Sequence, residues 1–405
     1  MKKIFATSIF AMAALSSNAA PLVTIGDQLD LFFRGSFTGS WNSNVTYTSS
    51  SDNKINDYAA IFRLGAEADY GRNSKFKANV KFFEDLTRYA QHKEFNSNLA
   101  HVAATASYTE QVLKIDANFS FDQRFQNTTT TIQDDALVRY NEYNAGINAT
   151  YNFSDKLDGE IGGMWQYTEY LGNWSATYSD VDVYSIPVSL LYRITPKISA
   201  GLTYQYRYTE FSGGSDSNIF WGGDKRNDHF GGVTVRGELL PKLTAMIYAG
   251  VTYRDPSGMD RLVTALYGDQ DDTTFAFRAT FGYEVSEKLG LFATGYRDFG
   301  NGASRQSAIN SGCEVGANYY FSEFIRSTAS FSYINSKYGT FGDSQNVRSS
   351  YDRDDDTFVG RIGLSYLPNK FITLSANYRY MNNSSSIPGC TYNQHLVDIS
   401  VAVKY

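Results

Sequence analysis

The sequence lacks any apolar segment long enough to cross a bilayer as a helix. Its mean hydropathy is polar, −0.36, and after residue 20 no run approaches the roughly 20 apolar residues that a helical span requires. Helical membrane spans are therefore excluded. Proline is scarce, at 7 of 405 residues, and two cysteines cannot build a disulfide scaffold. No Pro/Ser-rich linker divides residues 21–405, so we expect them to form a single domain.

Motifs for catalysis and for cofactor or metal binding are also missing. The sequence has no Gly-rich phosphate cradle and no metal-spaced Cys/His set. The four histidines, His92, His101, His229 and His395, are far apart, and we expect them to be solvated near one rim and not part of a catalytic group. We therefore expect no enzyme, no cofactor and no metal site. The net charge of −6 argues against a nucleic-acid partner.

The first twenty residues have the three parts of a secretory signal peptide. Lys2 and Lys3 supply the positive start, residues 4–15 are a short apolar stretch, and residues 17–20 have the small side chains of a cleavage site. The apolar stretch is too short for a membrane anchor. We expect residues 1–20 to be removed. Removal takes 2 of the 36 basic residues and leaves 34 against 42 acidic ones, a net charge near −8.

The rest of the chain alternates apolar and polar residues. Near the end, Val397, Ile399 and Val401 fall on one face, and Asp398 and Ser400 fall on the other. This period of two indicates a strand with one apolar and one polar side, which the 31 Tyr and 28 Phe also favour. Such segments are predicted near 29–42, 57–70, 74–88, 95–108, 111–123, 139–153, 156–170, 180–194, 197–210, 229–240, 242–254, 272–285, 288–299, 310–322, 324–337, 355–367, 370–382 and 395–405.

The connections between these segments alternate in length. Short turns such as 71–73 and 195–196 alternate with long loops such as 43–56 and 338–354. Short turns on one rim and long loops on the other are typical of bacterial membrane β-barrels. Many upward strands begin with Lys and an apolar residue, at Lys75, Lys156, Lys197, Lys242, Lys288 and Lys370. We therefore predict an all-β fold, in which residues 21–405 form a transmembrane antiparallel up-and-down β-barrel of about 18 strands.

Two other all-β architectures, a β-propeller and a soluble sandwich, share some of these sequence features. A β-propeller is one, because the Lys–apolar turns recur 41, 45 and 46 residues apart between Lys156 and Lys288. Each period, however, holds two strands of about thirteen residues and not the four short strands of a propeller blade. A soluble sandwich would show the same alternation. The signal peptide, the terminal aromatic residue and the loop asymmetry favour the membrane barrel.

With its signal peptide, its repeated turn pattern and its final strand ending in Tyr405, the chain resembles porin-like outer-membrane barrels, in particular the group of putative β-barrel porins. The resemblance covers all of residues 21–405; it is specific for class and topology and weak for substrate. It implies a multi-pass β-barrel in the bacterial outer membrane. It also implies that Tyr405, which replaces the commoner Phe, belongs to a sorting signal read by the barrel-assembly machinery. Membrane lipid and lipopolysaccharide are the other expected partners.

A closed wall of eighteen strands encloses a lumen too wide for side chains alone to fill. We therefore expect a porin-like channel for the passive diffusion of small hydrophilic solutes. A conduit for one substrate, such as an exported polysaccharide or a sugar, and a structural or adhesive barrel are the alternatives. Any constriction must come from inward-folded loops. The loop 211–228, with Phe220 and Trp221, is the first candidate, although it could equally cap the outer surface.

Successive side chains of a strand point to opposite faces, so odd and even positions (the parity) separate the lumen face from the lipid face. Charged side chains mark the lumen face, because a charge on the lipid face costs about 2–4 kcal/mol at the bilayer centre. Arg63 with Lys81, and Arg361 with Arg379, would form two basic clusters; the inward acids are fewer, with Glu160 among the clearest. This favours a weak anion preference. The alternative is that these arginines pair with lumen acids and stiffen the wall. The predicted pore-lining residues are Arg34, Arg63, Lys81, Asp116, Arg207, Arg236, Arg278, Arg361, Arg379 and Asp398.

The two cysteines are both expected on the outer side, where a disulfide would persist. Cys313 and Cys390 lie about four strands apart, roughly 20 Å along the wall. Direct bonding needs Cα atoms within about 7 Å. An inward fold of the last loop could cover the difference, so the spacing leaves a Cys313–Cys390 disulfide open. Two acidic segments, 269–272 and 352–356, could hold calcium, but neither has the spacing of a calcium loop, and solvated acidic loops are the plainer interpretation.

Overall fold

The computed structural model describes residues 21–49, 53–127, 136–214, 225–255, 273–302, 305, 307–338 and 353–405. The expected signal peptide at 1–20 and the acidic segment at 269–272 lie outside these residues. In the described part, no helix is long and apolar enough to cross a membrane.

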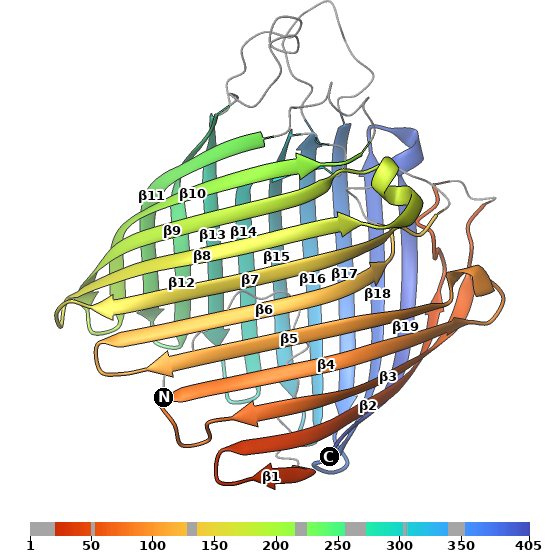
Figure 1. The fold of residues 1–405 in the computed structure, drawn as a ribbon, viewed down its shortest axis with the longest axis horizontal. Helices are drawn as coiled ribbons and strands as arrows, with labels where there is room; N and C mark the ends of the chain where they lie inside the picture. Colours follow the sequence, from red (N-terminus) through yellow and green to blue (C-terminus); the bar gives the residue numbers. More distant parts are fainter. Residues whose placement is uncertain are drawn as a thin grey trace, which may run out of the picture.

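The described strands form one antiparallel sheet that closes on itself (Figure 1). Short 3-10 helices, η1 (Lys93–Phe95), η2 (Gly172–Ala176) and η4 (Pro388–Cys390), lie in three of the connections. The strands are β1 Val23–Ile25, β2 Leu29–Asn42, β3 Asp57–Tyr70, β4 Phe76–Tyr89, β5 Ser97–Thr109, β6 Leu113–Phe125, β7 Arg139–Asn152, β8 Leu157–Tyr170, β9 Asp180–Thr195, β10 Ile198–Ser212, β11 Lys225–Leu240, β12 Leu243–Asp255, β13 Thr273–Glu284, β14 Leu289–Asn301, β15 Ser307–Tyr320, β16 Ile325–Tyr338, β17 Arg353–Tyr366, β18 Ile372–Ser385 and β19 Tyr392–Lys404.

The barrel closes where the last strand meets the first long one. Each of β2–β19 pairs with its neighbours in sequence, and β19 also pairs with β2, from Leu396 opposite Asn42 to Lys404 opposite Arg34. Beyond this seam the backbone of Tyr405 exchanges two hydrogen bonds with Phe33, at 2.6 and 3.0 Å. Each of the described strands β2–β19 is therefore paired on both sides, as a span through hydrocarbon requires. The prediction of an eighteen-stranded up-and-down barrel is confirmed.

The predicted strand boundaries differ from the observed ones by a few residues. The largest difference is in β11, which begins at Lys225 and not at 229. The first four residues of β11 are polar and continue the pairing with β10. Arg226 donates a hydrogen bond to Asn301, and Asp228 forms an ion pair with Arg207. β1 was not predicted, because three residues are too few to show a period.

A side-chain hydrogen bond explains the repeated Lys–apolar turns. In the turn before β8, the amide of Leu157 donates a hydrogen bond to the hydroxyl of Ser154 at 3.1 Å. The amide of Leu289 does the same to Ser286, also at 3.1 Å. Ser hydroxyls in this position replace a backbone turn bond. The intervening Lys is left exposed at the rim, which accounts for the motif.

Exposed charges also link neighbouring short turns. Lys75, before β4, donates a hydrogen bond to Glu110, between β5 and β6, at 2.6 Å. This hydrogen bond raises the pKa of Lys75 and lowers the pKa of Glu110. Because both side chains are exposed, the pair adds little to stability.

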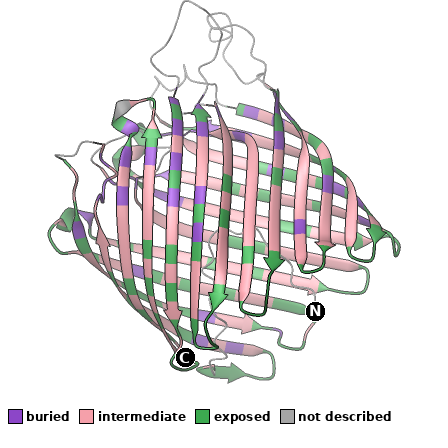
Figure 2. Cartoon of the chain, turned by 180° about the vertical axis from the view of Figure 1, so that it is seen from behind, coloured by how far each residue is buried: buried purple, intermediate pink, exposed green. Residues whose placement is uncertain are grey.

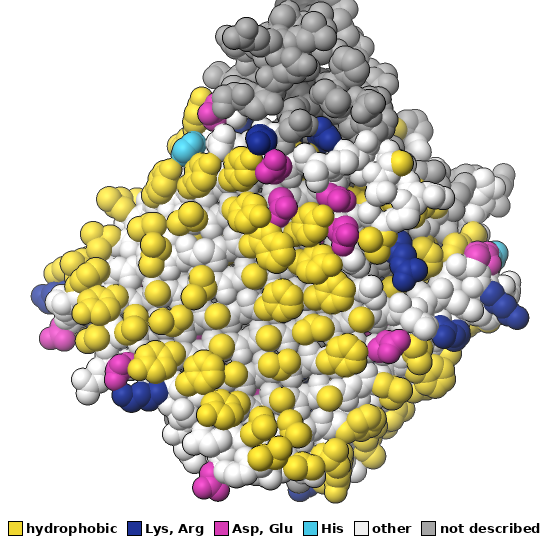
Figure 3. Space-filling view, in the orientation of Figure 1, with side chains coloured by type: hydrophobic (Ala, Val, Ile, Leu, Met, Phe, Trp, Pro, Cys, Tyr) yellow, Lys and Arg dark blue, Asp and Glu magenta, His cyan; other side chains and the backbone are white. Residues whose placement is uncertain are grey.

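The outer wall is apolar. Side chains that alternate outward include Leu202, 69% exposed, and Ile399, 64% exposed. Figure 3 shows hydrophobic side chains over most of the visible wall, with Lys and Arg side chains toward its edges. Aromatic rings gather at the rim, as where Tyr151 and Phe153 lie 5.1 Å apart. An apolar band flanked by aromatic residues is the lipid-facing surface of a membrane β-barrel.

Buried residues lie mainly toward the long-loop end of the barrel (Figure 2). Many of them are polar or charged, which is the reverse of a soluble core. The hydrophobic clusters in the described part are small and are built around the loops at that end: Val138, Tyr140, Tyr170 and Tyr178 in one, and Val45, Phe95 and Leu137 in the other.

Candidate functional site

Ion pairs identify the inner face of the wall because they join strands that are not neighbours. Arg207 on β10 lies 3.1 Å from Asp298 on β14, although four spacings of about 4.8 Å separate these strands along the wall. Arg236 on β11 lies 2.6 Å from Glu160 on β8. Side chains can meet in this way on the concave side of the sheet. Residues of the same parity on these strands therefore face the lumen.

Near the seam, the inner face centres on a buried carboxylate. Glu67 on β3 is 4% exposed and accepts a hydrogen bond from Arg34 on β2. It also lies 3.1 Å from Lys404 on β19 and 4.0 Å from Lys81 on β4. Asn79 donates a further hydrogen bond to it at 2.9 Å. Two predicted pore-lining residues, Arg34 and Lys81, thus form ion pairs with the same carboxylate, Glu67.

A row of alternating charges, the charge ladder, crosses the inner faces of β3–β7. Arg63 donates two hydrogen bonds to Asp85, its direct partner on β4, at 2.6 and 2.5 Å. At the other end, Arg124 donates a hydrogen bond to Glu142 on β7 at 3.0 Å. Each cation of the ladder therefore faces a carboxylate. Its members, in strand order, are Arg63, Asp85, His101, Asp122, Arg124 and Glu142.

The inner faces of β13–β18 carry a different pattern. At mid-strand this basic arc has three arginines and one carboxylate, Arg278, Arg361, Arg379 and Glu314. Arg278 is exposed and stands between Tyr248 and Tyr296, its direct partners on β12 and β14. Its guanidinium carbon is 6.0 Å from the Tyr296 ring centre, and no described carboxylate forms an ion pair with it.

Two arginines of the basic arc lie directly opposite each other. Arg361 on β17 and Arg379 on β18 are cross-strand partners, an arrangement of like charges that destabilises a sheet. Arg361 is 3.8 Å from Glu314, and Arg379 donates a hydrogen bond to Gln394 at 2.9 Å. The buried Nε of Arg379 has no hydrogen-bond partner in the described part. The basic cluster expected for this pair is present.

The other expected cluster does not form. Arg63 and Lys81 contact separate carboxylates, Asp85 and Glu67, because the register of β3 and β4 places an acid opposite or beside each cation. Sequence parity found the inward cations but missed these acids.

The remaining predicted pore-lining acids also lie on the inner face. Asp116 on β6 accepts a hydrogen bond from Lys114 of its own strand. Asp398 on β19 stands opposite Asn377 and Ser40. Among the described residues no ion pair holds Asp398.

The loop between β2 and β3 folds inward at the long-loop end. Asn44, Thr46 and Thr48 are completely buried. Asn44 donates hydrogen bonds to the carbonyls of Thr48 and Asn393, at 2.9 and 3.0 Å. From the far side, Asn127 after β6 donates one to the carbonyl of Thr46 at 3.3 Å. The loop therefore reaches from the seam across to β6.

Hydrophobic contacts hold this and a second loop in place. Val45 packs with Phe95 from η1 and Leu137 from before β7. Tyr178, in the loop after η2, is 1% exposed and lies 5.1 Å from the Tyr170 ring. Several connections at this end thus cover the opening of the barrel.

The upper end of β14 separates from β13 but stays paired with β15 as far as Asn301. Its pairing with β13 stops at Arg297, whereas the strand continues to Asn301. In this end of β14, which is not paired with β13, Asp298 accepts a hydrogen bond at 2.9 Å from Thr252 on β12, two strands away. The side chain of Asp298 therefore reaches across the inner face of β13 to contact β12.

Arg305, beyond β14, joins this strand end to other loops. It donates hydrogen bonds to the hydroxyl of Ser179 at 2.8 Å and to the carbonyl of Gly213 at 2.7 Å. Arg226 on β11 donates one to Asn301 at 2.5 Å and another to the carbonyl of Arg305. Segments that follow β8, β10 and β14 therefore meet over the lumen.

Comparisons with known proteins found a family match and similar solved structures. Residues 300–405 match the family model described as "Putative beta-barrel porin 2". The match covers 106 of the 405 residues, so the C-terminal part of this β-barrel resembles that family. No curated protein matches it. It is similar to crystal structures of Pseudomonas aeruginosa OpdK with vanillate (10% identity, 93% of this chain and 99% of that chain, TM-score 0.45) and OpdO (11%, 93% and 97%, 0.46).

The inward segments of this barrel lie on the long-loop side, which is extracellular in bacterial membrane β-barrels. The sequence had favoured 211–228, but its residues 215–224, with Phe220 and Trp221, lie outside the described residues. Among the described residues, the β2–β3 loop, the β8–β9 loop and the end of β14 fold inward at this end, and the candidate loop 211–228 stays untested. No periodicity marks an inward loop, so the sequence offered no signal for these three.

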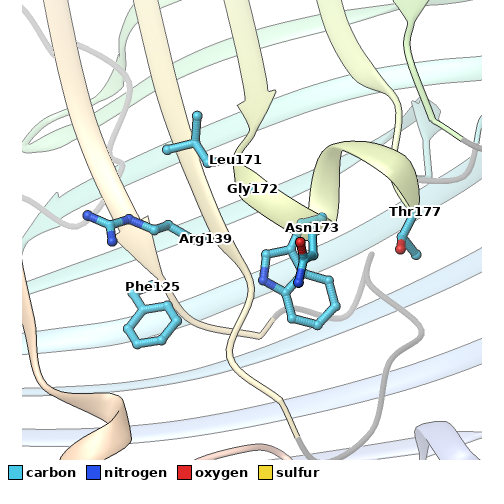
Figure 4. Close-up of a pocket in the computed structure, with 7 residues that line it drawn as sticks. Phe125, Arg139, Leu171, Gly172, Asn173 and Thr177 are labelled. Carbon is cyan, nitrogen blue, oxygen red and sulfur yellow. The ribbon is translucent and has the colours of Figure 1, made fainter.

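A cavity of about 720 Å³ lies beside η2 at the same end of the porin-like barrel (Figure 4). None of its described lining residues belongs to the charge ladder or the basic arc. It is therefore separate from the charged lumen wall. It is lined by Phe125, Arg139, Leu171, Gly172, Asn173, Trp174 and Thr177.

The two cysteines, both within the described residues, are not joined by a disulfide. Cys313 is exposed on the outward parity of β15, where it pairs with Gly295 and Tyr333. Cys390 is buried in η4, and its carbonyl accepts a hydrogen bond from Asn383 at 2.7 Å. The last loop does fold inward, but Cys313 points to the opposite side of the wall.

Proposed function

We propose that this porin-like barrel is a passive diffusion channel for small hydrophilic solutes, with a weak preference for anions. The basic arc is the observation that carries the proposal. Arg278 is exposed in the lumen without a described carboxylate partner, and Arg361 faces Arg379. In the ion pairs elsewhere on the wall, the positive and negative charges largely cancel in their effect on an ion that passes through the lumen.

Unbalanced charge on a pore wall favours ions of the opposite sign. The effect extends over a Debye length of about 8 Å at physiological ionic strength, so it is strong in a narrow lumen and fades in a wide one. The inward segments at the extracellular end narrow the path and support a limit to small solutes. Together these features favour a weak preference and not strict selectivity.

A planar bilayer tests both parts of the proposal. The refolded barrel should give stepwise conductance, and a potassium chloride gradient should give a reversal potential of the sign expected for chloride. Absence of conductance would contradict the channel itself. Conductance with cation selectivity would contradict the anion preference alone.

The inner aromatic residues do not single out a sugar path. Tyr248 and Tyr296 flank Arg278, whereas Phe32 and Phe83 lie on the far side beneath Lys404 and Arg63. Aromatic rings in two separate groups do not form a continuous track. Equal block of the current by a neutral oligosaccharide and by an inert polymer of similar size would agree with simple diffusion.

A further inference from the structure

The charge ladder contains one histidine, a residue type that ordinarily changes charge between pH 5 and pH 8. His101, on the inner face of β5, has Nδ1 2.7 Å from an oxygen of Asp122 and Nε2 3.4 Å from an oxygen of Asp85. Histidine is the side chain whose ordinary titration falls in this range. A neutral ring carries one N–H and would turn a lone pair toward one of the two carboxylates. The imidazolium form donates toward both.

Among the described residues, the groups that face His101 include no second histidine or other cation that titrates in this range. From β4, Asp85 faces the ring, with Arg63 of β3 hydrogen-bonded behind it. From β6, Asp122 faces it, with Arg124 3.7 Å from that carboxylate. Arginine keeps its charge throughout, and ordinary carboxylates titrate below pH 5.

The ladder also lies close beneath the constriction. Tyr89 stands four residues above Asp85 on the same inner face of β4, and packs on Phe95 at 5.8 Å. Phe95 in turn packs with Val45 of the inward β2–β3 loop. A change of charge at His101 therefore falls in the narrow part of the lumen, where wall charge acts most strongly on ions.

We propose that His101 makes the ion selectivity of the lumen depend on pH. With the imidazolium, the ladder holds three positive and three negative charges. Once the proton is lost, it holds two positive and three negative charges, and the wall opposite the basic arc becomes negative. Anion preference is then highest at low pH. This inference rests on the proposed channel function.

The test is the reversal potential in a potassium chloride gradient at pH 5 and pH 8. The chloride-to-potassium permeability ratio should fall about twofold between them, the effect of one unit charge within a Debye length in a water-like medium. His101→Gln should remove the dependence and fix the ratio near its pH 8 value. His101→Lys should fix it near its pH 5 value.

His395 supplies a matched control. It lies on the outward face of β19, where its Nδ1 is 2.8 Å from the Tyr378 hydroxyl. His395→Gln should behave like the wild-type barrel. A wild-type ratio that is equal at both pH values, or a pH dependence retained in His101→Gln, would overturn the inference and leave the channel standing. A wild-type barrel that conducts no ions would overturn both.

Discussion

The charge ladder and the basic arc lie on opposite sides of one barrel and use arginine in two different ways. In the ladder, Arg63 stands directly opposite Asp85 on the next strand. In the arc, Arg361 stands directly opposite another arginine, Arg379. The residue type and the inward parity are the same, and the cross-strand partner differs. Register therefore decides whether an inward arginine stands opposite a carboxylate or opposite another arginine.

The charge ladder and the basic arc face each other only if the barrel closes. The largest loss of folded barrel should therefore come from a change at the seam between β19 and β2. Deleting Tyr405, or replacing it with Asp, removes the aromatic end of the closing strand, whose ring lies 5.6 Å from Phe371. We expect the amount of assembled, heat-modifiable barrel in the outer membrane to fall more than about tenfold, because an open strand edge is not tolerated in lipid. Undiminished assembly of either variant would show that Tyr405 is no part of the sorting signal.

A second prediction concerns the shared acid near the seam. Glu67→Gln should destabilise the barrel by about 3 kcal/mol, since it leaves Arg34 and Lys404 facing each other without their carboxylate. The measurement is the temperature at which the folded barrel loses its fast migration on a gel.

Asp398→Asn is the matched control for this change. Asp398 is also an inward acid, but it has no ion pair in the described part, so its replacement should leave that temperature nearly unchanged. Equal losses in the two variants would mean that the ion pairs of Glu67 contribute nothing.

A third, smaller effect is expected at the constriction. Replacing residues 45–48 by two glycines removes the buried contacts of Val45, Thr46 and Thr48 while keeping the loop closed. Conductance should rise about twofold, and the anion preference should weaken as the lumen widens beyond the reach of its wall charges. Unaltered conductance would place the limiting constriction elsewhere in the lumen.

The sequence predicted the architecture well, for a physical reason. A strand that faces lipid on one side and water on the other must alternate, and several turns on the short rim repeat the same hydrogen bond, as at Ser154 and Ser286. Eighteen strands and an even count followed from those local patterns. Parity also placed Arg278 and Arg361 on the inner face.

What parity could not supply was the register between strands. Arg63 was expected to form a basic cluster with Lys81, because nothing within either strand shows that Asp85 stands opposite Arg63. The inward fold of Asn44–Thr48 was missed for a related reason. Its burial depends on Asn127 and Asn393, which are remote in sequence, and no local period encodes such contacts.

The reversal potential of paired variants tests the difference between the two sides most directly. In a potassium chloride gradient the wild-type barrel should show a weak chloride preference. Arg278→Ser with Arg361→Ser should abolish it, because both residues belong to the basic arc. Arg63→Gln with Asp85→Asn, which removes one charge of each sign from the ladder, should leave it unchanged. Cation selectivity in the wild-type barrel, unaffected by loss of Arg278 and Arg361, would contradict the account.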